Sequence, residues 1–401
     1  MKKIVRVLIN SLNRGGAERK LADLVNLLHS QPQKYDIKVY TLESGIKYPV
    51  SAPVIYIFRD SLVGRLDGKL FNLLKTIKAP SRISYLLQKE NLLGNRNIIF
   101  ISNLYRSNLV ALKLKKDKKI HKVIIADGIA PSRQYSKIQI ALLKKMVKHA
   151  DAGIFNSKWI ALEYEKLGMP SEKVFVIYNA RDIKGVIEKS KESLDEFSEL
   201  FEKNKVLLHV GRFDKQKNQV ALLETMKEIE KTSPKAFEEF HLVMVGKGPL
   251  LKKIQKLTQK MGLKNKVSFL GIQKNPFKFM KRSFALLLPS LWEGLPNVVI
   301  EALAVGLPVV ATDCRSGPRE ILAPDTDFKK QTTEIEYAKY GILVPVEPEE
   351  EISKHMAKAV VELYKNPKLH RKYSQSGPRR AEDFSMEKIG PKWEEVINSF
   401  Q

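Results

Sequence analysis

The sequence predicts an α/β protein made of two Rossmann-like domains, each with its own parallel sheet. Short apolar segments alternate with helical segments along the chain, a pattern typical of parallel sheets flanked by helices. The alternation is interrupted between residues 181 and 205, where the sequence becomes charged and helical in character. The length of 401 residues is too great for one ordinary core and suits two domains of about 200 residues.

Each predicted strand is a short apolar run. In the first half the strands are expected at Ile4–Ile9, Ile37–Thr41, Val54–Phe58, Ile98–Ser102, Val123–Ala126, Gly153–Asn156 and Val174–Tyr178. In the second half they are expected at Val206–Val210, His241–Val245, Val267–Leu270, Ala285–Pro289, Val309–Thr312 and Gly341–Val344. Helical patterns such as Ala17–His29 and Ser136–Lys148 lie between the strands.

We place the domain boundary near Ile183. This gives a first domain of residues 1–183, a second of residues 184–385, and a charged helix in residues 386–401 that is expected to cross back to the first domain. Parallel sheets bind ligands beyond the carboxyl ends of their strands. Two such domains therefore predict a cleft in which both sets of strand ends face each other, an arrangement that suits an enzyme with two substrates.

The composition restricts the class of protein. An apolar content of 43% and a charged content of 28% are typical of a folded chain, and no apolar run approaches the roughly 18 residues that span a bilayer. The segment Ile4–Asn10 is too short for a signal-peptide core. Cys314 is the one cysteine, which excludes an intrachain disulfide and a cysteine-based metal cluster. We expect a cytoplasmic protein.

Positive charge is concentrated in the first half of the chain. The net charge is +26, with 32 basic and 13 acidic residues in residues 1–180 against 38 and 31 in the remainder. A basic first half of the chain suits an anionic partner, either a phospholipid leaflet or a nucleic acid. The alternative is a Lys-rich proteome, which would raise the net charge of every protein. The basic segments are Lys113–Lys122 and the amphipathic Ser136–Lys148. No RRM, KH, zinc-finger or helix-turn-helix signature supports nucleic-acid binding.

The most specific motif is the segment Trp292–Glu301, which places two glutamates between two predicted strands. Glu293 is expected in a loop and Glu301 just over one turn inside the helix that follows, with Pro296 in its first turn. A helix start favours a bound anion, so the two carboxylates could accept hydrogen bonds from sugar hydroxyls on either side of a diphosphate. The alternative is a pair of solvated glutamates on a surface helix.

A second motif, Gly211–Asn218, directly follows a predicted strand. Arg212 and Lys217 lie five residues apart and could clamp a diphosphate and neutralise its charge, with Lys215 as a less favoured substitute for Lys217. The alternative is a basic turn on a basic protein. A third motif contains Gly15 and Gly16, which allow close backbone approach to a ligand at a helix start. The dinucleotide fingerprint G-x-G-x-x-G is absent, which argues against an NAD-dependent oxidoreductase.

These motifs together resemble the retaining family 4 glycosyltransferases of the bacterial lipopolysaccharide and lipid-linked oligosaccharide type, which have the two-domain GT-B fold and an E-x7-E motif. The resemblance covers nearly the whole chain and is most specific from Val206 to Leu322. It implies that Glu293 holds the donor sugar and Glu301 the ribose. It also implies that Arg212 and Lys217 stabilise the diphosphate without a metal.

The resemblance extends to further donor-binding residues. It implies that Gly15 and Gly16 pack against the diphosphate, that Gly294 and Leu295 belong to the donor site, and that Gly246 and Gln273 lie around the nucleotide base. The last two also suit ordinary turns at strand ends. The segment Ser316–Glu320 resembles a second helix start near the donor, where Glu320 either contacts the donor or only caps the helix.

One position departs from the family pattern. Many family members have a histidine after the strand that corresponds to Val123–Ala126, and this chain has Asp127 followed by Gly128. Asp127 either provides the hydrogen-bonding group at the reaction centre or only initiates a turn, as Asp-Gly pairs commonly do. Both interpretations are kept open.

The resemblance implies transfer of a hexose or N-acetylhexosamine from a UDP-sugar, with retention, to a lipid-linked saccharide or lipopolysaccharide precursor. The protein is expected to attach peripherally to the anionic inner face of the cell membrane, to need no cofactor or metal and to bind no nucleic acid. The alternative is a basic module that binds nucleic acid or anionic membranes on a degenerate glycosyltransferase fold.

Overall fold

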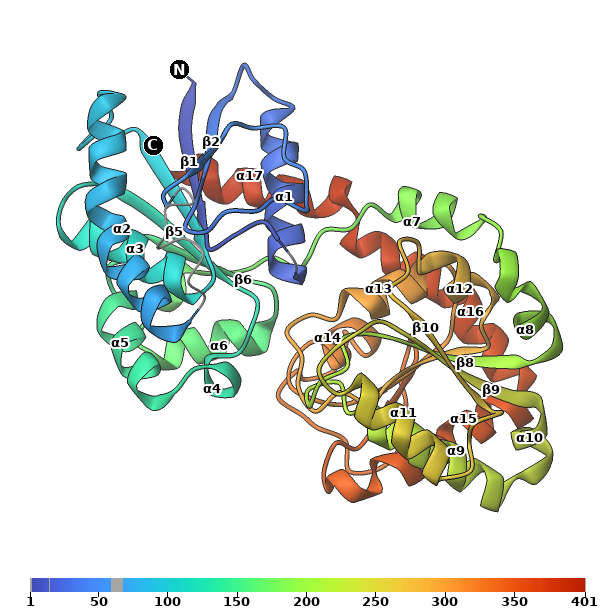
Figure 1. Ribbon diagram of the computed structural model, residues 1–401. Coiled ribbons are helices and arrows are strands. Elements are labelled where there is room, and N and C mark those ends of the chain that lie inside the picture. The colour runs from blue at the N-terminus through green and yellow to red at the C-terminus, as the bar shows by residue number, and fades with distance from the viewer. Residues whose placement is uncertain (1, 14, 59–67, 401) are drawn as a thin grey trace. The chain divides into compact units, whose positions relative to one another are not determined.

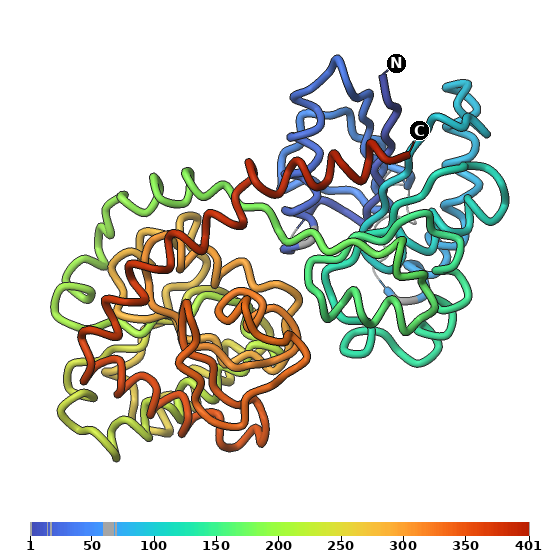
Figure 2. Tube along the Cα trace, turned by 180° about the vertical axis from the view of Figure 1, so that it is seen from behind, coloured from blue at the N-terminus to red at the C-terminus, as the bar shows by residue number. Residues whose placement is uncertain are grey.

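The computed structural model describes residues 2–13, 15–58 and 68–400, and these residues form two compact units. The first unit contains Met1–Ala180 together with Ile389–Gln401, and the second contains Arg181–Lys388. The chain thus divides at Ala180, and both of its ends belong to the first unit (Figures 1 and 2).

The first unit contains a parallel sheet in the order β3-β2-β1-β4-β5-β6-β7. Its strands are β1 (Lys3–Ile9), β2 (Tyr35–Thr41), β3 (Val54–Tyr56), β4 (Ile98–Asn103), β5 (Lys122–Asp127), β6 (Ala152–Phe155) and β7 (Val174–Val176). The inner strand β1 pairs on both sides, with Val5 opposite Ile37 and Ile99. Because neighbouring side chains of a strand point to opposite faces, Val7 enters one core and Leu8 the other.

Helices cover both faces of this sheet (Figure 1). The helices of the unit are α1 (Gly16–His29), α2 (Lys69–Lys89), α3 (Tyr105–Lys116), α4 (Pro131–Gln134), α5 (Lys137–Val147), α6 (Lys158–Lys166) and α17 (Met386–Ser399), with a 3-10 turn η1 (Ser171–Lys173). Apolar residues of α2, α3, α5 and α6 pack in one core, and those of α1 and α17 in the other. Helix α17 contributes Trp393, which is 3% exposed.

The second unit repeats this architecture with the strand order β10-β9-β8-β11-β12-β14-β13. Its strands are β8 (Lys205–Val210), β9 (Phe240–Val245), β10 (Val267–Gly271), β11 (Ala285–Leu288), β12 (Val309–Thr312), β13 (Glu336–Tyr337) and β14 (Ile342–Val344). Only β13 runs antiparallel to its neighbour among these strands of the described chain.

Helices again surround the sheet of the second unit. They are α7 (Ile183–Ser190), α8 (Ser198–Lys203), α9 (Gln219–Thr232), α10 (Pro234–Glu239), α11 (Leu251–Lys260), α12 (Phe277–Arg282), α13 (Asn297–Ala304), α14 (Pro318–Leu322), α15 (Ile352–Lys365) and α16 (Pro367–Ala381), with 3-10 turns η2 (Asp195–Phe197), η3 (Glu349–Glu351) and η4 (Glu382–Phe384). Helix α16 packs closely on α13, because a Cβ atom added to Gly377 would lie 3.0 Å from the carbonyl oxygen of Leu303.

The structure confirms the predicted fold class, and every predicted strand is present with ends that differ by at most two residues. Helix α13 begins at Asn297, so Pro296 occupies the position before the helix and not its first turn as predicted. Helix α2 and strand β13 were not predicted. Within the described ranges, no helix combines the length and apolar character required to cross a bilayer.

Candidate active site

The predicted site residues fall into two groups. Gly15, Gly16 and Asp127 belong to the first unit, and the others belong to the second. In both units these residues follow or end strands, at the carboxyl edge of a parallel sheet, where such sheets bind ligands.

Three adjacent strands of the second unit end in glycines that bring their backbones together. The Gly211 N–H after β8 donates to the Val245 carbonyl at 2.9 Å, and the Gly246 N–H after β9 donates to the Gly271 carbonyl at the end of β10 at 2.7 Å. Gly246 has a φ of +138°, and a Cβ atom there would lie 1.9 Å from the Gly211 carbonyl oxygen. The absence of side chains therefore allows these strand ends to form one continuous backbone surface.

Gly246→Ala is expected to destabilise the second unit by about 3 kcal/mol or more, because the new methyl group collides with backbone and the φ value is unfavourable. Gly262→Ala is a matched control, since Gly262 has a φ of +73° but no atom within 4 Å of an added Cβ. It should cost only about 1–2 kcal/mol. Urea unfolding measures both changes, and equal losses would contradict the steric explanation.

The loops after β8 and β11 are joined through Glu293. Its carboxylate, 6% exposed, accepts a hydrogen bond from the Lys217 ammonium at 2.5 Å and a second from the Gln216 amide at 3.4 Å. The Gln216 amide also donates to the Trp292 carbonyl at 2.8 Å. The structure therefore brings together two residues predicted from separate motifs, Lys217 and Glu293, in a partly buried ion pair at the carboxyl edge of the sheet.

The loop after β12 holds the glutamate segment from the other side. The Ser316 N–H donates to the Glu293 carbonyl at 3.1 Å, and the Ser316 hydroxyl donates to the Gly294 carbonyl at 2.8 Å. A Cβ atom on Gly317, whose φ is +97°, would lie 2.5 Å from the same Gly294 oxygen. Leu295 is 5% exposed. The backbone of the predicted donor segment is thus fixed by hydrogen bonds and close packing before α13 begins.

The second glutamate of the motif forms a different ion pair. Glu301 lies on α13, is 7% exposed, and pairs with the guanidinium of Arg181, which is 2% exposed. Arg181 was not among the predicted site residues, and 120 positions separate it from its partner. The spacing of seven residues between the glutamates therefore places each carboxylate in the second unit beside its own cation.

Arg212 lies apart from the Lys217–Glu293 pair. Its side chain is 72% exposed, and its closest charged partner among the described residues is Asp214, at 3.7 Å. Asp214 in turn accepts a hydrogen bond from the Lys217 N–H at 3.1 Å, which fixes the turn of the loop. An exposed guanidinium on a fixed loop is free to reorient towards an anion. Gln273 donates its side-chain amide to the Leu270 carbonyl at 2.7 Å, after β10.

A buried histidine fixes the base of the loop after β8. The pKa of His209 is lowered to about 4, chiefly by burial and to a smaller extent by the charge of Lys217. The ring Nδ1 lies 3.0 Å from the Leu287 carbonyl oxygen and Nε2 lies 3.2 Å from the Gln219 amide nitrogen. With Nδ1 protonated, Nε2 accepts from Gln219, whose amide also donates to the Arg212 carbonyl at 2.7 Å. The neutral imidazole therefore supports the loop.

Stability should fall as the pH is lowered from 6.5 to about 4. In this range an unfolded His209 binds a proton that the folded imidazole, with its lower pKa, does not bind. The loss reaches about 3 kcal/mol. Burial lowers the pKa of His241 to about 4 as well, which adds a smaller loss of the same sign. Measurements of the unfolding free energy between pH 7 and pH 4.5 test this prediction. A His209→Gln variant whose unfolding free energy falls as steeply with decreasing pH as that of the wild type would contradict it.

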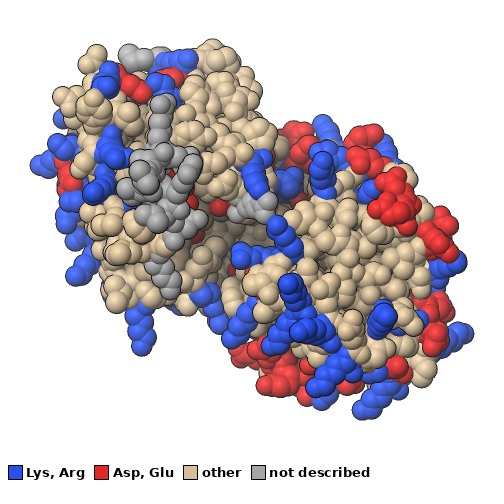
Figure 3. Space-filling model, viewed as in Figure 1, with Lys and Arg blue, Asp and Glu red and all other residues tan. Residues whose placement is uncertain are grey.

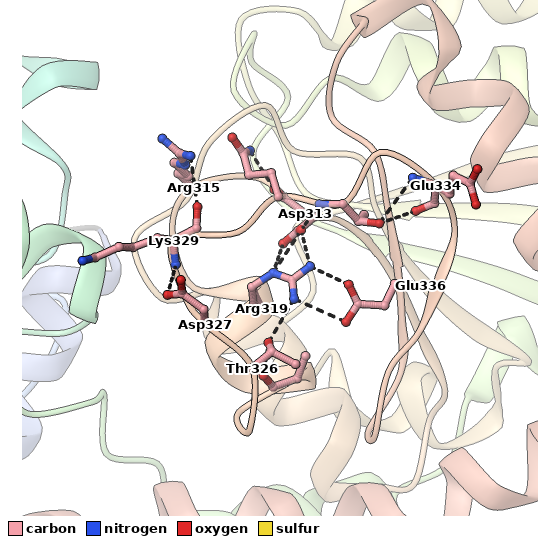
Figure 4. A network of polar contacts seen from close by, with 11 residues as sticks. Asp313, Arg315, Arg319, Thr326, Asp327, Lys329, Glu334 and Glu336 are labelled. Atoms are coloured by element: carbon pink, nitrogen blue, oxygen red, sulfur yellow. Dashed lines mark hydrogen bonds and ion pairs between the residues drawn. The ribbon is translucent and has the colours of Figure 1, made fainter.

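A network of polar contacts fixes the loop that follows α14 (Figure 4). The Arg319 guanidinium, on α14, donates to Asp313 at 2.6 Å and to Glu336 at 2.6 Å. Asp313, at the end of β12, also accepts from the Thr332 N–H at 2.6 Å. Burial raises the pKa of the Asp313 carboxyl, and Arg319 opposes that shift. These contacts keep the segment from 313 to 336 ordered around the start of α14.

In the first unit Asp127 is buried at the end of β5. One carboxylate oxygen accepts from the N–H groups of Gly128 at 2.8 Å and Ile129 at 3.3 Å, as in an Asx turn. The other accepts from the hydroxyls of Tyr135 at 2.5 Å and Tyr164 at 2.7 Å. Burial raises the Asp127 pKa, and these hydrogen bonds oppose the shift. Asp127 therefore organises the loop after β5, and its catalytic role stays a prediction.

The predicted glycine turn of the first unit leads directly into α1. Gly15 is the residue before the helix and Gly16 its first residue, while Arg14 lies outside the described residues. A Cβ atom on Gly15 would lie 2.2 Å from the Glu18 carboxylate, so glycine allows Glu18 to fold back over the helix start. Burial raises the pKa of Glu18, and Glu43 raises it further.

Comparisons with known proteins identify the family. Residues 190–380 match the family model of glycosyl transferases group 1, and residues 14–184 match that of glycosyltransferase family 4. An uncharacterized glycosyltransferase of Methanocaldococcus jannaschii is 36% identical over 280 residues, which are 66% of this chain and 67% of the relative. A Campylobacter jejuni enzyme, N-acetylgalactosamine-N,N'-diacetylbacillosaminyl-diphospho-undecaprenol 4-alpha-N-acetylgalactosaminyltransferase, is 27% identical over 391 residues, 96% of each chain.

Solved structures show the same fold. The structure of Anabaena HepE in complex with UDP superposes with a TM-score of 0.76 at 18% identity and covers 100% of both chains. The apo lipopolysaccharide outer core galactosyltransferase WaaB superposes with a TM-score of 0.71 at 19% identity, covering 99% of this chain and 100% of WaaB. The two Rossmann-like units and these matches lead to one conclusion: the chain belongs to glycosyltransferase family 4 and is a glycosyltransferase with the GT-B fold.

Proposed function

We propose that the protein transfers a hexose or N-acetylhexosamine from a UDP-sugar to a lipid-linked saccharide or lipopolysaccharide precursor, with retention of anomeric configuration, at the cytoplasmic face of an anionic membrane. The observation that carries this proposal is the partly buried Lys217–Glu293 pair beside the start of α13. A cation, a carboxylate and a helix start together suit a glycosyl diphosphate, which is anionic at one end and rich in hydroxyl groups at the other.

Each residue of the second unit has a role in this proposal. Lys217 and Arg212 stabilise the negative charge that develops on the departing diphosphate. Glu293 accepts a hydrogen bond from the transferred sugar, and Glu301 accepts one from the ribose. Gly246 and Gln273 lie around the base. Because two cations are available, the proposal requires no metal ion.

The reaction balances without a covalent intermediate on the protein. The bond between the anomeric carbon and the diphosphate oxygen breaks, and the electron pair leaves with UDP. The acceptor oxygen forms a bond to the same carbon on the same face of the sugar. The proton of the acceptor hydroxyl passes to a phosphate oxygen of the departing UDP.

The relatives support the choice of substrates. The Campylobacter enzyme is named for a diphospho-undecaprenol-linked saccharide, and another relative, from Salmonella typhimurium, is a lipopolysaccharide 1,6-galactosyltransferase. HepE was crystallised with UDP and with UDP-glucose. Chemistry of this kind suits a first unit that carries most of the positive charge, since lipid-linked diphosphates lie in an anionic leaflet.

The test is transfer from a panel of UDP-sugars to polyprenyl-diphosphate-linked saccharides in the presence of EDTA, with the anomeric configuration of the product read by proton NMR. An α-linked product from an α-linked UDP-sugar, lost in Glu293→Gln, supports the proposal. A β-linked product would refute retention. Absence of transfer and of nucleotide binding, together with binding to DNA, would favour the alternative of a basic binding module on a degenerate fold.

A further inference from the structure

Four helices of the first unit carry positive charge without any acidic residue. Helices α2, α3, α4 and α5 contain five, four, one and three Lys or Arg residues, thirteen in total, and no Asp or Glu. Their neighbours differ, since α1 contains Glu18 and Asp23, and α6 contains Glu163 and Glu165. The segregation of charge is therefore a property of particular helices rather than of the whole unit. On the face that Figure 3 shows, Lys and Arg side chains lie along the outer edge of the first unit.

Helix α2 also exposes a stripe of large apolar side chains. Leu70, Leu73, Leu74 and Ile77 are 65%, 56%, 41% and 64% exposed. Their spacing of three, one and three residues places them on one side of a helix. The core-facing side is a different one, formed by residues such as Ile83, which is fully buried. The stripe is thus additional to the apolar face that folding requires.

Helix α5 repeats this combination. Ile138 is 82% exposed and Leu142 44% exposed, and the two lie one turn apart beside exposed lysines such as Lys144 and Lys145. Helices α2 and α5 flank α3, which contacts both, and all three pack on the same face of the sheet. Of the eleven large apolar residues that are exposed in the described chain, these two helices carry seven.

The apolar stripe of α2 lies at the edge of the sheet where the strands end. The Thr76 hydroxyl accepts a hydrogen bond from the Arg106 guanidinium at 3.0 Å, and Arg106 pairs with Glu43. Arg106 and Glu43 follow β4 and β2, at their carboxyl ends. The basic segment Lys113–Lys122, by contrast, joins the end of α3 to the start of β5, at the opposite edge.

We propose that the exposed residues of α2 and α5 form a membrane-docking surface, in which Leu70, Leu73, Leu74, Ile77 and Ile138 enter the interface of an anionic bilayer while the surrounding lysines contact lipid phosphates. Leucine and isoleucine side chains favour binding only where they leave water, and basic side chains favour binding only to an anionic surface. A bilayer with anionic lipids meets both conditions at once.

Other occupants fit less well. A nucleic acid would neutralise the lysines but would leave the aliphatic stripe in water, and it would favour aromatic side chains for stacking. A second copy of the chain would cover the stripe but would bring like charges together, because α2 and α5 contain Lys and Arg residues and no Asp or Glu. The inference deepens the proposed function and rests on it, because it names the surface through which the site reaches a lipid-linked acceptor.

The experiment measures sedimentation with vesicles of phosphatidylcholine containing 30% phosphatidylglycerol, over a series of salt concentrations. Leu73→Gln combined with Ile77→Gln should weaken binding at least about tenfold at every salt concentration, because apolar insertion is not screened. Lys144→Gln combined with Lys145→Gln should weaken binding at low salt only. The matched controls lie in the second unit, Ile187→Gln on α7 and Lys252→Gln combined with Lys256→Gln on α11, and should bind like the wild type.

Three results would overturn the proposal. These are absence of vesicle binding by the wild type, unchanged binding by the α2 variant, and a wild-type dimer that the α2 variant converts to a monomer. UDP binding, measured on every protein, separates this proposal from the previous one. Vesicle binding without UDP binding would refute the proposed function and leave the docking surface intact, whereas UDP binding with unaltered vesicle binding in the α2 variant would refute the docking surface alone.

Discussion

Replacing Lys217 by alanine is expected to lower kcat/KM for the sugar donor by about 100- to 1,000-fold. The ammonium group belongs to the loop after β8, contacts Glu293, and is the cation that the proposed function assigns to the diphosphate. Its loss removes charge that acts most strongly on the departing group, and it also leaves the Glu293 carboxylate, 6% exposed, without its cation. Steady-state kinetics with varied donor measure the effect.

Lys215→Ala is the matched control for this prediction. Lys215 lies two residues away in the same loop, is exposed, and carries the same charge. Its replacement should change kcat/KM by less than about threefold, as expected for a solvated surface charge. Arg212→Ala should resemble Lys217→Ala rather than Lys215→Ala. Equal losses for Lys215 and Lys217 would show that the loop supplies only general positive charge.

The second large effect is expected at Glu301. Glu301→Ala should destabilise the protein by about 3–5 kcal/mol, because it leaves the guanidinium of Arg181 buried without its carboxylate partner. The same change should abolish measurable nucleotide binding if the carboxylate contacts the ribose. Unfolding by urea and calorimetric titration with UDP measure the two consequences separately.

A double variant separates these consequences. Arg181→Leu combined with Glu301→Leu replaces both buried charges by apolar side chains and should recover most of the lost stability. It should not recover nucleotide binding, because no carboxylate is restored. Recovery of both properties would show that Glu301 acts only through the ion pair and has no contact with the donor.

The strands could be predicted because their signal is local. Each is a run of buried apolar residues such as those of β9 and β12, which read as strands without knowledge of their neighbours. Helix α2 was missed because its pattern is mixed: it contains Pro80, and its apolar residues lie on an exposed side as well as a buried one. Strand β13 has only two residues and depends on pairing with β14.

The site could be predicted in part for the same reason. Glycines, glutamates and basic residues at strand ends are visible in the sequence, and the structure places Lys217 beside Glu293. The contacts made by Arg181 and Ser316 were not predicted, because residues far apart in the chain meet only after both loops have folded. The chain holds no local signal for such pairs.

The exposed leucines of α2 show a further limit. Their helical spacing is present in the sequence, but an apolar stripe normally indicates a buried face. Only the fractional exposures of Leu73 and Ile77, 56% and 64%, reveal that this stripe is left in solvent. The basic helix α5 was expected to face an anionic surface, and the proposed membrane-docking surface adds helix α2 to it.

The most direct test of the account is calorimetric titration of the purified protein with UDP, GDP and ADP in the presence of EDTA. Selective binding of UDP that EDTA does not weaken is the expected result, with loss of that binding in Arg181→Leu combined with Glu301→Leu, the variant that should recover most of the stability lost in Glu301→Ala. Absence of binding by all three nucleotides, or binding that EDTA abolishes, would contradict the assignment of Lys217, Glu293 and Glu301 to a metal-free donor site.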